Sequence, residues 1–269
     1  MVCNYFLWFL SYSFLGWIYE SIYCSIAERK WVSRGFLNGP ICPIYGAGAV
    51  LFLTTLRGLQ NPIYIFFAGM ILASLLEYIT SWTLEKLFHA RWWDYEQFFL
   101  NIHGRVCLMA GAVFGGFAVI LIQWVHPWAE RVTYQIPEPT RWVAAIVLFV
   151  ILLADCMVTF LRLVQFTNKL NEIQIAMNGF FREYRMQAGT ILASFAEKFE
   201  GSRAYTERIR FLLQNWTFQE KRILRAFPKV RSQSFNEALQ KVKQRILVEK
   251  RNTSGEKKES NQEPTETNK

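Results

Sequence analysis

The sequence EYITSWTLEKLFHARWWDYEQFFLNIHGRVCL, from Glu77 to Leu108, places aromatic and charged residues between two apolar runs. It begins with a carboxylate inside the apolar run 64–84 and ends where the apolar run 106–125 begins. A bilayer core of about 30 Å needs about 20 helical residues, so each run can cross a membrane. We therefore predict the end of one transmembrane helix, an interfacial loop and the start of the next helix.

Three further apolar segments extend this pattern toward both ends of the chain. Residues 2–25 and 142–163 are each long enough to cross a bilayer, whereas residues 45–56 form a shorter segment. We predict that the shorter segment is a tilted or partly re-entrant helix. The predicted fold is all-α: a polytopic membrane helix bundle of about five transmembrane helices in residues 1–163, followed by a helical cytoplasmic C-terminal tail.

The positive charge of the chain is concentrated after the last apolar run. Residues 1–163 carry ten Lys and Arg against nine Asp and Glu, whereas residues 164–250 carry sixteen against eight. Apolar residues recur at helical spacing in the second segment, so we predict a basic amphipathic helical region there. Residues 251–269 are polar without such periodicity, and we expect disorder. A basic region beside a membrane favours lipid headgroups over nucleic acid as its partner.

The charges of the loops predict the orientation of the bundle. Lys and Arg are retained on the cytoplasmic side of the membrane during insertion. The loops after the first and third predicted spans carry six such residues, and those after the second and fourth carry three. We therefore expect the N-terminus outside and the C-terminus in the cytoplasm.

Three carboxylates, Glu20, Glu77 and Asp155, lie inside predicted spans. An acidic residue at the centre of a membrane helix costs about 2.5 to 3.5 kcal/mol, so it normally faces protein or water. Two interpretations stay open. The carboxylates line a substrate path, or they pair with loop arginines such as Arg34 and Arg105 and thereby fix the bundle.

The loop after the first span, RGFLNGPICPIYGAG, cannot form a continuous helix. Gly39 and Gly46 permit unusual backbone angles, while Pro40 and Pro43 favour extended or turn conformations in the residues before them. Such backbone at membrane depth must be buried in protein or line a cavity. The sequence leaves open whether this segment, with Tyr45, is re-entrant or is a surface turn leading into the second helix.

The loop after the third span carries an aromatic and charged cluster. Such a cluster can hold a lipid headgroup or a polar solute by stacking and charged hydrogen bonds. The alternative is an aromatic belt in which Asp94 pairs with Arg91 or Arg105. His89 and His103 lack companion ligands at suitable spacing, so we predict no metal site. The candidate residues of this loop and its flanks are Glu85, Trp93, Asp94, Tyr95, Asn101 and Arg105.

The remaining motifs favour a non-enzymatic chain. Neither GxGxxG nor GxxxxGK[ST] occurs in the glycine-rich loop, and no catalytic arrangement can be assigned from spacing, so no cofactor is predicted. Gly111 and Gly115 form a GxxxG pair, which can bring two membrane helices close together.

Three ordered segments carry a family resemblance. The run YFLWFLSYSFLGWIYE, the loop RGFLNGPICPIYG, and LLEYITSWTLEKLFHARWWDY followed by NIHGRVCL together resemble the bacterial family called putative ABC-transporter type IV, or CmpB-like ABC-transporter permeases. The resemblance covers about residues 4–165. The family pattern falls on Trp17, Glu20, Arg34, Gly35, Gly39, Pro40, Pro43, Tyr45, Gly46, Glu77, Glu85, Trp93, Asp94, Tyr95, Asn101, Gly104 and Arg105.

The resemblance implies a permease subunit of unknown substrate. No Walker motif is present, so ATP hydrolysis would require a separate ATPase subunit. Five spans are few for a complete translocation path, which suggests a homo-oligomer or a complex in contact with membrane lipids. Two alternatives stay open: a membrane-embedded enzyme acting on a lipid or headgroup, with Glu77 or Asp94 as general acid or base, and a non-transporting scaffold or sensor.

Overall fold

A computed structural model describes residues 1–29 and 33–187 and six short pieces near the C-terminus: 222–224, 226–227, 230–232, 236–237, 239–240 and 242–244. The chain divides into two compact units. The first unit comprises Met1–Val164 and Arg225–Arg231, and the second comprises Gln165–Leu224 and Ser232–Lys269. The predicted disordered segment, 251–269, lies outside the described residues, as does most of the predicted amphipathic region.

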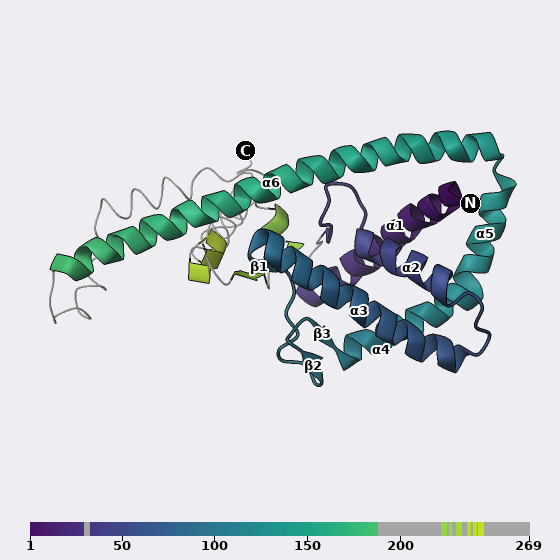
Figure 1. The fold of residues 1–269 in the computed structure, drawn as a ribbon, viewed down its shortest axis with the longest axis horizontal. Helices are drawn as coiled ribbons and strands as arrows, with labels where there is room; N and C mark the ends of the chain where they lie inside the picture. The colour runs from purple at the N-terminus through teal and green to yellow at the C-terminus, as the bar shows by residue number, and fades with distance from the viewer. Residues whose placement is uncertain are drawn as a thin grey trace, which may run out of the picture. The chain divides into compact units, whose positions relative to one another are not determined.

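The described residues are almost entirely helical, which confirms the predicted all-α class (Figure 1). The helices are α1 (Val2–Glu28), α2 (Pro43–Thr55), α3 (Pro62–Phe88), α4 (Leu108–Ile120), the π-helical turn η1 (Leu121–Val125), α5 (His126–Gln135) and α6 (Glu138–Gln187). Four two-residue strands complete the described structure: β1 (Ala90–Arg91), β2 (Asn101–Ile102), β3 (Val106–Cys107) and β4 (Arg231–Ser232). Strands β2 and β3 form an antiparallel hairpin, with Asn101 opposite Cys107.

Three of the described helices are long and apolar enough to cross a bilayer, so the chain is a membrane protein. They are Pro62–Phe88, Leu108–Gln135 and Glu138–Ile175. Helix α1 also has sufficient length, with 27 residues, but six Tyr and Trp residues lower its hydropathy. Helix α2 has 13 residues and is about 20 Å long, which is too short to cross alone. The count agrees loosely with the prediction of about five transmembrane helices.

The predicted short segment 45–56 coincides with helix α2, and an irregular segment, 33–42, precedes it. The Cys42 N–H donates to the carbonyl of Ser13 at 2.9 Å, so the chain between α1 and α2 returns about 22 Å along α1 from its end at Glu28. Helix α2 then packs beside the first half of α1, where Trp8 contacts the cluster containing Ala49 and Leu53. Bonds to α1 and α6 therefore hold this irregular segment at Cys42, Asn38 and Gly39, although Asn38 and Pro40 remain exposed.

Two helices continue past their predicted ends. The predicted span 106–125 runs through η1 into α5 and ends at Gln135. The predicted span 142–163 belongs to α6, which continues without interruption to Gln187. No Gly or Pro interrupts residues 142–178, so a change from apolar to amphipathic composition does not end the helix.

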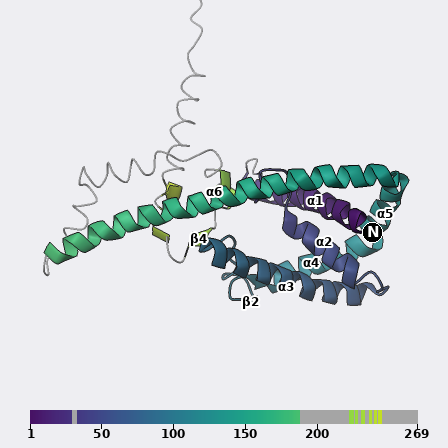
Figure 2. The same ribbon diagram turned by 45° about the horizontal axis from the view of Figure 1, so that its top comes forward.

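Close packing joins the helices of the first unit in two pairs, α1 with α2 and α3 with α4, which lie side by side in both views (Figure 2). A Cβ at Gly46 would collide with the Ser13 hydroxyl and the Phe9 carbonyl on α1. A Cβ at Gly115 would lie 2.7 Å from the Phe66 carbonyl on α3, and Gly111 also faces α3. The predicted GxxxG packing face is therefore confirmed.

Candidate functional site

A cavity of about 260 Å³ lies inside the first unit, between α1, α2, α3, α4 and η1. Its walls are mainly aromatic and aliphatic, with Phe52, Leu76, Phe114 and Phe117 among them. Among the residues that the structure describes, Glu77 is the only carboxylate that lines it. An apolar chamber with one acidic group is the usual composition of a small-molecule site.

Glu77 is 7% exposed and only half satisfied by its neighbours. The Tyr95 hydroxyl, from the loop between α3 and α4, donates to Oε1 of Glu77 at 3.0 Å. The other carboxylate oxygen, Oε2, is buried and has no hydrogen-bond partner among the described residues. Burial, followed by the charge of Glu77, raises the pKa of Tyr95 well above its usual range, so this phenol stays neutral and keeps its proton as a donor.

A second carboxylate, Glu20 of α1, is hydrogen-bonded to Tyr45, which lines the cavity. The hydroxyl of Tyr45 donates to Oε2 of Glu20 at 2.5 Å. Nε of Arg34 lies 3.7 Å from Oε1 of Glu20 and donates to the Cys24 sulfur at 3.0 Å. Gly16 makes this arrangement possible, because any Cβ there would overlap the Tyr45 ring. The predicted interaction of Glu20 with a loop arginine is thus present, although the tyrosine contact is much closer.

Asp155 of α6 binds the backbone of the irregular segment before α2. Its Oδ1 accepts hydrogen bonds from the backbone N–H of Asn38 at 3.0 Å and from the Asn38 side chain at 2.7 Å. Its Oδ2 accepts from the Gly39 N–H at 2.7 Å. Thr159, one turn later on α6, also donates to Asp155 at 3.3 Å. These bonds satisfy backbone donors that a helix would have paired internally. Pro40 follows directly and cannot donate.

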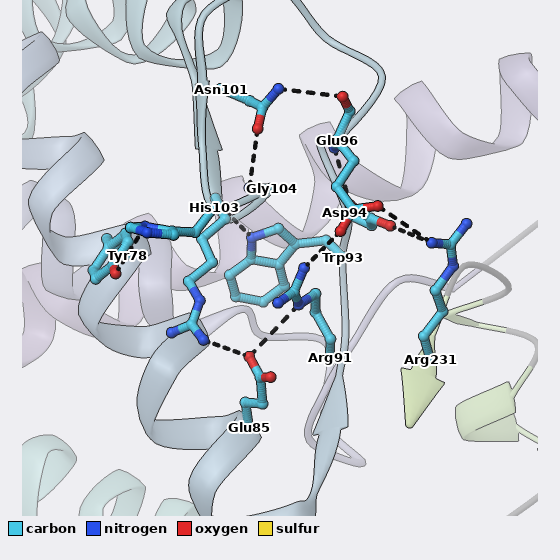
Figure 3. Close-up of polar contacts among 11 residues, drawn as sticks. Tyr78, Glu85, Arg91, Trp93, Asp94, Glu96, Asn101, His103, Gly104 and Arg231 are labelled. Atoms are coloured by element: carbon cyan, nitrogen blue, oxygen red, sulfur yellow. Dashed lines mark hydrogen bonds and ion pairs between the residues drawn. The ribbon is translucent and has the colours of Figure 1, made fainter. Parts of the chain in front are cut away.

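The loop between α3 and α4 contains a largely buried ion network (Figure 3). Nη2 of Arg105 donates to Oε2 of Glu85 at 2.7 Å, and Nε of Arg91 lies 3.5 Å from the same oxygen. The three side chains are only 11–17% exposed. The indole N–H of Trp93 donates to the Arg105 carbonyl at 3.0 Å, which fixes the backbone beside this network. Arg105 therefore pairs with Glu85, whereas the sequence left open whether it pairs with one of the carboxylates inside the predicted spans.

The structure pairs Asp94 with Arg231 at 3.0 Å, in place of the predicted Arg91 or Arg105 (Figure 3). The side chain of Asn101 closes the hairpin turn, because its oxygen accepts from the Gly104 N–H at 3.1 Å. Gly104 has a φ of 66°, in the region that glycine adopts without strain.

Sequence reasoning missed two residues near the C-terminus that belong to the first unit. The Phe227 ring lies 5.1 Å from the Trp92 ring and 5.1 Å below the Arg34 guanidinium. Arg231 supplies the partner of Asp94. Both lie more than 130 residues from these partners in the chain, so no local pattern could have predicted the contacts.

The profile of the family described as putative ABC-transporter type IV matches residues 7–160. The chain belongs to this family. It is a transporter-like membrane protein. The part that matches the putative ABC-transporter type IV family extends from α1 into α6 and includes Glu20, Glu77 and Asp155, whereas Phe227 and Arg231 lie beyond it. No curated protein and no solved structure matches the chain.

Proposed function

We propose that the chain is the permease subunit of an ABC-type transporter whose ATPase is a separate subunit. The observation that carries this proposal is the cavity between α1, α2, α3 and α4, with the half-satisfied carboxylate of Glu77 in its wall. A buried acidic group inside a membrane domain is costly unless it binds something, so such groups often mark a transport pathway. The family membership is compatible with this role.

The orientation follows from the loop charges. The proposed location is the bacterial cytoplasmic membrane, with the N-terminus outside and the loop 89–107 and the C-terminus in the cytoplasm. This places the Glu85 network and the Asp94–Arg231 contact on the side where an ATPase would dock. Membrane lipids surround the bundle, and a second copy of the chain would complete the path.

Two carboxylates, Asp155 and Glu85, have positioning roles in this proposal. Asp155 holds the irregular segment at Asn38 and Gly39, and Glu85 holds Arg91 and Arg105. Both carboxylates accept protein donors, and neither has an oxygen among the described buried atoms without a partner, in contrast to Glu77. The substrate path would therefore involve Glu77, with Tyr95 and the Glu20–Tyr45 pair beside it.

The proposal is tested by purifying the tagged protein from native membranes in a mild detergent and identifying what accompanies it. A stoichiometric ATPase subunit is the expected result. Its ATPase activity in the complex should respond to Glu77→Gln but not to Glu172→Gln, a matched exposed acid on α6. Recovery of the chain alone, at normal yield, would contradict the permease assignment.

Glu77→Gln also distinguishes a permease from an enzyme that acts on a lipid headgroup. Tyr95 and Glu77 form a hydrogen-bonded pair of titratable groups beside a cavity, the observation that favours an enzyme as second candidate. If Glu77→Gln abolished turnover of a lipid by the isolated chain, without any ATPase present, the enzyme would replace the permease.

A further inference from the structure

We propose that the cavity binds a lipophilic molecule carrying a protonated amine, with the ammonium group on Oε2 of Glu77 and the apolar part against the aromatic walls. This inference rests on the proposed function and names the substrate class of the same site. Three observations support it. An oxygen of Glu77 lacks a partner among the described residues, the nearby arginines contact other groups, and the cavity has a suitable volume and an apolar rim.

The carboxylate of Glu77 needs a positively charged donor. Its side chain is 7% exposed, and Oε2 lacks any partner in the part of the chain that the structure describes. A buried ionised oxygen without a partner is strongly destabilising, and an ammonium group supplies both the opposite charge and up to three N–H donors. An anionic ligand would instead add repulsion to Glu77 and to the neighbouring Glu20–Tyr45 pair.

The arginines that could have neutralised Glu77 are engaged elsewhere. Arg34 contacts Glu20, donates to the Cys24 sulfur and donates to the Ala226 carbonyl at 2.6 Å. Arg105 donates to Glu85 through Nη2, and its Nε and Nη1 have no hydrogen-bond partner among the described residues. No ion pair joins Glu77 to any of the described cations, so a cationic ligand would meet no bound cation at this carboxylate.

The rest of the chamber selects an apolar body of limited size. A dry cavity of about 150 Å³ takes one benzene ring, so about 110 Å³ of the 260 Å³ remains for a short alkyl tether. The aromatic rings of Tyr45 and Phe114, 6.0 Å apart, form part of the wall. Aromatic faces also attract a cation that passes over them.

The rim of the cavity indicates entry from the bilayer. Leu15 of α1 is 50% exposed and Ile120 of α4 is 46% exposed, and both line the cavity. Between them, the rings of Tyr19 and Phe117 meet edge to face, with centroids 5.0 Å apart. A rim of exposed apolar side chains on two membrane helices faces hydrocarbon, so a lipophilic amine would reach Glu77 laterally between α1 and α4.

The test uses the full chain in nanodiscs, without an ATPase, and two probes of equal shape: 4-phenylbutylamine and 4-phenylbutan-1-ol. Binding is measured by isothermal titration, with protein-free nanodiscs subtracted. The wild-type chain should bind the amine at least about tenfold more tightly than the alcohol, because a charged hydrogen bond is stronger than a neutral one. Glu77→Gln should remove this preference while leaving the thermal unfolding midpoint near that of the wild type.

A pair of glycine variants locates the binding. A Cβ at Gly48, in the cavity wall, meets only Leu76 at an ordinary 3.6 Å, so Gly48→Leu should fill the chamber and abolish binding of both probes. Gly116 on α4 has open space around it and does not line the cavity, so Gly116→Leu should bind as the wild type does.

Equal affinity of the wild type for amine and alcohol would overturn the inference, as would an unchanged preference in Glu77→Gln. Binding that is lost equally in Gly48→Leu and Gly116→Leu would place the ligand outside the cavity and also overturn it. These outcomes are independent of the ATPase, so failure to recover an ATPase would reject the permease and leave the amine site standing, and the reverse also holds.

Discussion

At the scale of single residues, the first unit satisfies its acidic groups in three different ways. Asp155 accepts backbone N–H groups, Glu85 accepts two arginines, and Glu77 accepts a single tyrosine. The first two arrangements are complete without any ligand. Only the third leaves a buried carboxylate oxygen available, which is why the substrate site is placed at Glu77.

Asp155→Asn should weaken the attachment of the segment before α2. An amide has only one oxygen, so its NH2 group must face either the Asn38 or the Gly39 N–H. At least one charged hydrogen bond is then lost, and two donors face each other. We expect a loss of about 2–3 kcal/mol in stability, measured as a lower thermal unfolding midpoint in detergent. Glu172→Gln, on the same helix, is the matched control. An equal decrease in both variants would argue against the described role of Asp155.

Glu85→Gln should destabilise the loop network because it removes the carboxylate that Arg91 and Arg105 share. The side chains are only 11–17% exposed, so the expected loss is about 3 kcal/mol. Glu96→Gln removes a carboxylate that also contacts Arg91, but Glu96 is 56% exposed, so its loss should be below about 1 kcal/mol. Chemical unfolding of the two variants in matched detergent measures the difference, and similar midpoints would refute it.

The sequence predicted which residues are polar inside the bundle but not what they contact. Glu20, Glu77 and Asp155 were identifiable because each interrupts an apolar helical run. The bonds of Asp155 to Asn38 and Gly39 join residues more than 110 positions apart, and hydropathy carries no information about such distances. Pairings of Arg105 with Glu85 and Asp94 with Arg231 were missed for the same reason.

At the scale of elements, the second membrane crossing consists of the irregular segment 33–42 and helix α2. It depends on the close approach of α1 and α2. The short helix α2 can complete the crossing only together with the preceding irregular segment, which is bonded to Ser13 of α1 and Asp155 of α6. Gly46 sets this approach on the α2 side and Gly16 on the α1 side. Sequence hydropathy located the apolar part of this crossing, whereas the irregular half, being short and rich in Gly and Pro, has no hydropathy signal of its own.

Gly46→Ala should separate α1 from α2. The new methyl group would collide with the Phe9 carbonyl, which is backbone and cannot rotate away. Overpacking of this kind costs about 1–3 kcal/mol. Gly116→Ala, in open space on α4, should be neutral or slightly stabilising because alanine favours helix. Thermal unfolding in detergent compares the two; a Gly46→Ala protein as stable as Gly116→Ala would disprove the close approach.

At the scale of the whole molecule, the two compact units do not follow the order of the chain. The stretch Arg225–Arg231 belongs to the first unit, although the chain between Gln165 and Leu224 belongs to the second. A boundary near 164 was predictable from the change in composition. The return of the chain was not, because Phe227 and Arg231 are ordinary residues of a basic region until their partners are known. The predicted division into a transmembrane region, 1–163, and a basic amphipathic region, 164–250, stays a prediction.

Phe227→Ala should destabilise the first unit, because the ring contacts both Trp92 and the Arg34 guanidinium. An aromatic contact and a cation–π contact together are worth about 1–2.5 kcal/mol. Phe99→Ala removes a ring that is 79% exposed and should have little effect on stability. The check is the thermal unfolding midpoint of the full chain, and equal midpoints for the two variants would exclude a stabilising role for the return segment.

The π-helical turn η1 holds one residue more than an α-helical turn, so it absorbs that residue without changing the rotation of the helix after it. Deleting one residue from Leu121–Val125 would therefore return the span to ordinary α-helix and leave the same face of α5 turned inward. His126, now 3.0 Å from the Tyr12 hydroxyl, would keep its place beside α1. Deleting one residue within α4 would instead rotate the helix that follows by about 100° and turn His126 away from α1.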